Sequence, residues 1–144
     1  MGKVSIVFWS GTGNTAAMAS MVADGVTAAG GEAEVLPVDA VLTSDLADVK
    51  AIAFGCPSMG AEQLEENVME PFMEEMDGQI SGKAVGLFGS YGWGNGEWMQ
   101  DWEARVQADG ANLVNGEGVI CNAAPDADAE EALKALGSAL AQLA

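Results

Sequence analysis

The sequence predicts an α/β fold in which helices cover both faces of one open, parallel β-sheet. Short continuous apolar runs alternate along the chain with longer stretches whose apolar residues recur every three or four positions. Strands buried on both faces produce the first pattern, and amphipathic helices produce the second. Because 144 residues is the size of one domain, we expect a single domain over residues 1–144 with one functional site.

Five strands are expected in this sheet. Four are the apolar runs at residues 4–9, 32–38, 51–55 and 84–89, and the fifth lies within residues 112–121. The first run is too short to cross a membrane and leads directly into a glycine-rich loop, so it is neither a signal peptide nor a membrane span. We therefore expect a cytoplasmic protein without a membrane segment.

Four helices are expected between and after these strands. Their apolar stripes run over residues 18–29, 64–76, 98–106 and 133–143. The first helix should stop at Gly30 and Gly31, because glycine adopts the left-handed conformation that ends helices. Pro71 should kink or interrupt the second helix, because it lacks the backbone N–H that a helix interior uses. A short additional helix is expected within residues 39–48.

The charge balance is strongly acidic. Twenty-two Asp and Glu residues stand against five Lys and Arg residues, with no histidine, so the formal net charge is −17. This balance excludes nucleic-acid binding, because a phosphate backbone requires clustered basic side chains. It predicts either a partner with a positive face, attracted electrostatically, or a protein that the charge keeps soluble without a further role.

The cysteines and the missing histidines limit the chemistry. Cys56 and Cys121 lie 65 residues apart in apolar surroundings, with no Cys-x-x-Cys spacing. A zinc site, a Cys-His nucleophile and a histidine-based acid–base mechanism therefore lack their parts. We expect buried structural thiols, no metal ligands and no catalytic residues. Any reaction has to rest on carboxylates, hydroxyls, tyrosine or a cofactor.

The segment after the first strand is suited to hold a phosphate. It consists of Ser10, Gly11, Thr12, Gly13, Asn14 and Thr15. In open α/β sheets ligands bind beyond the carboxyl ends of the strands, and a helix N-terminus offers N–H donors and a favourable dipole to an anion. The alternative is an ordinary glycine turn capped by Ser10 or Thr12. No lysine follows, which excludes a nucleotide triphosphatase loop, and four hydroxyl or amide side chains suit a monophosphate better than a pyrophosphate.

Two further glycine-containing segments follow the third and fourth strands. The first contains Ser58, Met59, Gly60, Ala61 and Glu62, and the second contains Ser90, Tyr91, Gly92, Trp93 and Gly94. Glycine at position 60 permits a positive φ and more than one peptide orientation, and the methionine offers an apolar contact to a flat ring. Exposed aromatic side chains on the second segment favour a stacked planar ligand. A plain tight turn and a tryptophan that contacts a partner are the alternatives.

Together these segments resemble those of the flavodoxins, especially the short-chain clostridial type, over essentially the whole chain. The resemblance rests on residues 9–15, 55–60 and 89–94. It implies a flavodoxin-like doubly wound sheet of five parallel strands in the order 2-1-3-4-5, one non-covalently bound FMN and no enzymatic reaction. It also implies a carrier of single electrons. Together with the acidic charge, it leads to the hypothesis of a low-potential carrier that cycles mainly between the neutral semiquinone and the anionic hydroquinone.

The resemblance also implies roles for the site residues. The phosphate is expected on the side chains of the first segment, where Gly11 and Gly13 let backbone amides approach, with Ser58 as a substitute contact. The flavin ring is expected between Met59 and Trp93, with Glu62 near its N3–H. The other contacts come from Ser90, Tyr91, Gly92 and Gly94. The turn of Met59, Gly60 and Ala61 is similar to the family's redox-sensitive turn, whose carbonyl rotates toward flavin N5–H, although relatives often carry a polar side chain in place of Ala61.

Acidic residues are concentrated between positions 61 and 78, where the sequence has no basic residue. The seven carboxylates are those of Glu62, Glu65, Glu66, Glu70, Glu74, Glu75 and Asp77. At an effective dielectric of about 40 and a distance of roughly 12 Å, each opposes an anion by about 0.7 kcal/mol. Several of them are expected to lower the second reduction step of the cofactor by on the order of 100 mV.

The main alternative function is an FMN-dependent NAD(P)H:quinone or dye reductase of the same fold. Such an enzyme needs a second pocket and usually basic residues for the nucleotide phosphates, and this acidic chain offers little of either. A third is an acidic interaction module without a cofactor, which leaves the three glycine-containing loops unexplained. The carrier predicts different partners, namely basic-faced redox proteins such as ferredoxin- or flavodoxin-dependent oxidoreductases. We expect these partners to dock transiently on a monomer.

Overall fold

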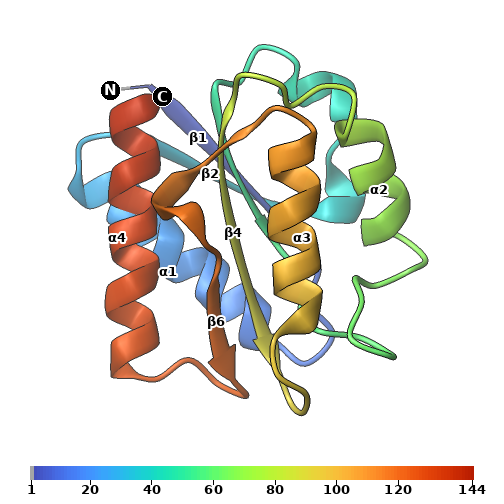
Figure 1. The fold of residues 1–144 in the computed structure, drawn as a ribbon. Helices are drawn as coiled ribbons and strands as arrows, with labels where there is room; N and C mark the ends of the chain where they lie inside the picture. Colours follow the sequence, from blue (N-terminus) through green and yellow to red (C-terminus); the bar gives the residue numbers. More distant parts are fainter. Residues whose placement is uncertain (1) are drawn as a thin grey trace.

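The computed structural model describes residues 2–144 and shows one parallel sheet between two helical layers (Figure 1). The strands are β1 (Lys3–Phe8), β2 (Glu32–Pro37), β3 (Ala51–Gly55), β4 (Ala84–Tyr91), β5 (Asn112–Leu113) and β6 (Val119–Asn122). One face is covered by α1 (Asn14–Ala28) and α4 (Ala127–Leu143), the other by α2 (Met69–Met76) and α3 (Glu97–Ala108). The predicted order 2-1-3-4-5 is confirmed. Over these residues, no helix combines the length and the apolar composition needed to cross a bilayer.

The expected fifth strand is divided into two parts. β5 pairs with the beginning of β4, and β6 pairs with its end. Between them, Asn115 and Gly116 have φ values of 64° and 74°. A strand does not continue through two left-handed residues, so the chain makes a short turn there before it rejoins β4. The single strand expected within residues 112–121 is corrected to two short strands on one sheet edge.

The second helix begins later than its apolar stripe predicted. α2 starts at Met69, because residues 66–68 form a turn. Pro71 therefore lies in the first helical turn, where no intrahelical acceptor awaits its missing N–H, and the expected interruption does not occur. The helix expected within residues 39–48 is replaced by two 3-10 turns at Val38–Ala40 and Thr43–Leu46.

Close backbone packing fixes α1 against α4. A β-carbon added to Gly137 would collide with the carbonyl oxygen of Val22, and one added to Gly25 would collide with that of Lys134. α1 ends as predicted, because the N–H groups of Gly30 and Gly31 donate hydrogen bonds to carbonyls of its last turn. This packing holds the N-terminus of α1 at the carboxyl edge of the sheet.

Replacement of Gly137 by alanine tests this packing. We expect Gly137→Ala to lower the free energy of unfolding by about 2 kcal/mol, because the added methyl group meets backbone that has no room to move. Urea denaturation followed by circular dichroism measures the change. Gly78→Ala is the control, because nothing lies within 4 Å of its added β-carbon, and equal effects of the two substitutions would refute the packing argument.

One ion network joins α2 to α3. The Arg105 guanidinium donates to Asp77 at 2.8 Å through Nη2 and to Glu70 at 2.9 Å through Nη1. Burial disfavours the charged guanidinium, but these two carboxylates raise the pKa of Arg105 above its ordinary value. Burial, and then the adjacent Asp77 carboxylate, raise the pKa of Asp109 from 3.8 to about 6. At neutral pH the ionised carboxylate of Asp109 is therefore an unfavourable negative charge beside Asp77.

The raised pKa of Asp109 predicts a pH-dependent stability. Protonated Asp109 stabilises the fold below about pH 4, and this contribution is lost as the pH rises through about 6. Asp109→Asn should therefore raise the free energy of unfolding by about 1 kcal/mol at pH 7 and by little at pH 4. Urea titrations at both pH values measure this. Asp24→Asn on α1 is the control for the loss of one charge, and an equal gain at both pH values would contradict the prediction.

Candidate functional site

A cleft of about 300 Å³ opens where β1, β3, β4 and β6 end. Eight of the sixteen predicted site residues line it: Gly11, Thr12, Asn14, Ser58, Met59, Ser90, Tyr91 and Gly92. Its other lining residues are Trp9, Pro57 and Ala123. The parallel sheet thus brings together segments that are far apart in the sequence.

The loop after β1 leaves the N-terminus of α1 open. Gly13 precedes the helix with a φ of 98°, and no side chain caps the first turn. The Ser10 hydroxyl instead accepts a hydrogen bond from the Gly13 N–H at 3.1 Å and shapes the loop. Neither Ser10 nor Thr12 caps the helix with its side chain. The first N–H groups of α1 therefore remain available to an anion.

Thr15 contributes a buried hydroxyl with no partner. Its side chain lies in the first turn of α1, is 1% exposed, and its Oγ1 makes no hydrogen bond within residues 2–144. An unpaired buried hydroxyl costs free energy, so it indicates a group that the folded chain does not supply. Together with the open helix N-terminus, it forms a neutral donor set that fits a phosphate monoester.

The loop after β3 is tied to β4 at its base and closed on itself at its tip. The Ser58 N–H donates to the Ser90 carbonyl at 3.0 Å. Met59 and Gln63 exchange two backbone hydrogen bonds of 2.8 and 2.9 Å. Gly60 lies in the turn between them with a φ of 52°, in the left-handed region that its sequence position predicted.

A buried tryptophan and a buried cysteine anchor the same loop. The Trp98 Nε1–H donates to the Cys56 carbonyl at 3.1 Å. Gly89 permits this approach, because a β-carbon there would collide with the same carbonyl oxygen. Burial raises the pKa of the Cys56 thiol to about 12, which makes it an inert packing group. Both cysteines are free and buried, as predicted.

Glu62 lies outside the cleft, at the N-terminus of α3. Its Oε1 accepts hydrogen bonds from the N–H groups of Gly96 and Glu97, each at 3.1 Å. Its φ of 51° is uncommon for a residue with a side chain, and Gly94 makes room for the carboxylate. The carboxylate therefore joins the loop after β3 to the loop after β4.

The remaining predicted residues do not line the cleft. Trp93 is 64% exposed. Tyr91, by contrast, is the half-buried last residue of β4. The Tyr91 ring packs against Trp98 with a centroid distance of 5.8 Å. Ser10, Gly13, Thr15, Gly60, Ala61 and Gly94 are likewise absent from the lining.

Sequence reasoning assigned no role to Ala123, which lines the cleft. Its N–H donates to the Tyr91 carbonyl at 2.9 Å, and its φ is 57°. It directly follows β6, so its position after the last strand was the available clue. Its small apolar side chain gave no chemical indication. Within the described residues, no group of three potential metal-ligating side chains is present.

The acidic segment at residues 61–78 is partly compensated from elsewhere in the fold. Arg105 of α3 pairs with Glu70 and Asp77, so a basic residue does lie beside this segment. Burial opposes the charge of Glu65, but the N–H groups of residues 69, 68 and 67 lower the pKa of its carboxyl below the ordinary value. The expected repulsion from seven uncompensated charges is therefore an overestimate.

Comparisons with known proteins identify the family and its fold. The family model described as Flavodoxin matches residues 6–135. The chain is 45% identical to a flavodoxin of Megasphaera elsdenii, covering 96% of this chain and 98% of that protein. It is 42% identical to a flavodoxin of Clostridium beijerinckii, covering 87% and 91%.

Solved structures agree with this result. The solution structure of the two-electron reduced Megasphaera elsdenii flavodoxin superposes with a TM-score of 0.89, covering 96% of this chain and 98% of that one. A flavodoxin from the domain Archaea, at 27% identity, superposes with a TM-score of 0.87, covering 97% and 96%. These relatives favour the electron carrier over the reductase. The chain therefore belongs to the flavodoxin family, the electron-transfer proteins that bind FMN.

Proposed function

We propose that residues 1–144 form one FMN-binding domain that carries single electrons at low potential in the cytoplasm. One observation carries this proposal: the uncapped N-terminus of α1 and the unpaired Thr15 hydroxyl lie beside a cleft with apolar walls from Trp9, Met59 and Tyr91. This arrangement suits a ligand with a phosphate at one end and a flat ring at the other. When bound, FMN supplies two successive one-electron transfers.

The chain holds the two ends of this cofactor with different groups. The segment from Ser10 to Thr15, which offers only neutral donors, would hold the phosphate. Met59 would contact the ring on one side and Trp93 on the other, which would account for an indole that is 64% exposed. Gly60 gives the turn at residues 59–63 the freedom to rotate a peptide toward the ring.

The acidic segment at residues 61–78 disfavours the second electron. Glu66, Glu74 and Glu75 are exposed to solvent. Arg105 offsets one charge of this group, and the helix N-termini beside Glu62 and Glu65 offset part of two more. The net charge of the segment remains strongly negative, so the carrier uses mainly the second, low-potential step.

The same charge selects the partners. A net charge of −17 attracts redox proteins with a basic face and opposes self-association, which supports transient docking by a monomer. Two free, buried thiols agree with a reducing compartment such as the cytoplasm.

Stepwise anaerobic reduction, followed by the visible spectrum, tests the carrier function. We expect one FMN per chain, identified by mass after acid release, and two well-separated one-electron steps. The purified protein alone should not turn over NAD(P)H. A single two-electron step with steady NAD(P)H oxidation would instead support the reductase, and a lack of affinity for FMN would refute both functions.

Thr15→Val tests the proposed phosphate contact. Loss of a hydrogen bond to a charged group should raise the Kd for FMN about 10- to 100-fold. The FMN-free protein should keep its stability, because the replaced hydroxyl has no partner there. Ser5→Ala is the matched control: Ser5 also has a buried, unpartnered hydroxyl, but it lies in β1 away from the cleft lining. Fluorescence titration of FMN measures both variants, and equal affinities would contradict the assignment.

A further inference from the structure

One methionine of the cleft wall belongs to neither hydrophobic core. Met59 lines the cleft and is half-buried, but it is not among the residues that pack against the core on either face of the sheet. Of the other methionines within residues 2–144, Met21 is also half-buried, and it packs against the core under α1 and α4. The remaining five are at most 2% exposed: Met18, Met69, Met73, Met76 and Met99. Solvent therefore reaches Met59 at a place where its side chain supports no part of either core.

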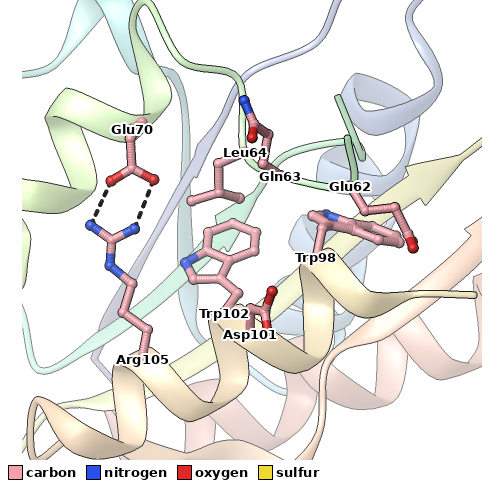
Figure 2. A pocket seen from close by; sticks show the side chains of 8 residues that line it. All are labelled: Glu62, Gln63, Leu64, Glu70, Trp98, Asp101, Trp102 and Arg105. Carbon is pink, nitrogen blue, oxygen red and sulfur yellow. Dashed lines mark hydrogen bonds and ion pairs between the residues drawn. The ribbon is translucent and has the colours of Figure 1, made fainter. Parts of the chain in front are cut away.

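The backbone of Met59 is held without help from its side chain. Its N–H and carbonyl form hydrogen bonds of 2.8 and 2.9 Å with the backbone of Gln63. Beyond this turn, Leu64 is 7% exposed and lines a cavity of about 200 Å³ together with Trp98 and Trp102 of α3 (Figure 2). That cavity shares no lining residue with the cleft. The loop is therefore anchored on the side of α3, and the Met59 side chain can change chemically while the loop stays in place.

The two cysteines are poor competitors for an oxidant. Burial raises the pKa of the Cys56 thiol to about 12. Burial, and then the nearby Asp126 carboxylate, raise the pKa of the Cys121 thiol. Peroxides react with the ionised thiolate, which neither cysteine supplies in appreciable amount at neutral pH. A thioether has no proton to lose, so the reaction of Met59 with a peroxide needs no ionisation.

Oxidation of Met59 would change the chemistry of the cleft wall. A methionine sulfoxide is polar and chiral, whereas the thioether is apolar and polarizable. Trp9 and Tyr91 supply apolar surface to the same wall. A flat ring bound against Met59 would lose a favourable sulfur–aromatic contact and would separate the sulfoxide oxygen from water. The bound ring would also cover the thioether and slow its oxidation.

We propose that Met59 is an oxidation site at which hydrogen peroxide controls the loading of FMN. The peroxide transfers one oxygen atom to the Met59 sulfur, the thioether loses two electrons to become the sulfoxide, and the peroxide is reduced to water. The FMN-free chain reacts and then binds FMN weakly, whereas the FMN-loaded chain is protected. A methionine sulfoxide reductase reverses the change. This inference rests on the proposed function, because it uses the contact between Met59 and the ring.

Treatment of the FMN-free and the FMN-loaded protein with hydrogen peroxide tests the site. The chain has eight methionines, so the methyl signals of methionine-labelled protein are few enough to follow one by one by NMR. We expect the Met59 signal to move to its sulfoxide position about five-fold more slowly in the loaded protein. Oxidation of Met59 should raise the Kd for FMN about 10-fold, and methionine sulfoxide reductase should restore it. The free energy of unfolding should stay unchanged, because Met59 packs against neither core.

Two variants separate Met59 from other oxidised groups. In Met59→Leu, peroxide should change the Kd for FMN by less than about two-fold relative to the untreated variant. Met21→Leu is the matched control, because it removes the other half-buried methionine of residues 2–144, away from the cleft lining, and should lose affinity as the unsubstituted chain does. An unchanged Kd after full oxidation of Met59, equal oxidation rates with and without FMN, or an equal loss of affinity in Met59→Leu would overturn the proposal. The FMN affinity and the one-electron steps of the untreated protein test the carrier function separately, so this site can fail while that function stands.

Discussion

The parallel alignment of four strands places every loop of the site at one edge of the sheet. β1, β3, β4 and β6 all end there, and hydrogen bonds between neighbouring strands hold their ends together. β4 lies between two of these strands, because it pairs with β3 on one side and with β6 on the other. Its last residues, Ser90 and Tyr91, therefore accept the hydrogen bonds that hold the loops on both sides, from Ser58 and Ala123.

The loops form hydrogen bonds with one another and leave only a few buried polar groups without a partner. Glu62 bonds to the N-terminus of α3, whereas the N-terminus of α1 stays uncapped beside the unpaired Thr15 hydroxyl. This difference separates groups that build the site from groups that await a ligand. Among the buried indoles, Trp98 anchors the loop after β3, whereas the Trp102 Nε1–H has no acceptor within residues 2–144.

Local patterns predicted most of the fold and the place of the site. Apolar runs and helical spacing predicted the sheet and its helices. Burial of a strand on two faces, or of a helix along one stripe, produces an apolar pattern within a short stretch of sequence. The six residues from Ser10 to Thr15 predicted an anion site because donors, glycines and a helix start coincide there. Gly60 predicted a left-handed turn, and the structure has a φ of 52° at that position.

Contacts between distant segments decided the rest. Pro71 interrupts nothing because the carboxylate of Glu65 holds the preceding turn and delays the start of α2. Arg105 compensates acidic residues that lie about 30 positions earlier, and no local pattern reveals such a pairing. Ala123 reaches the cleft only because β6 pairs with the end of β4. The sequence by itself determined the fold, the family and the ligand-binding edge, whereas tertiary packing decided which polar groups there are paired, because pairing depends on distances that only the folded chain sets.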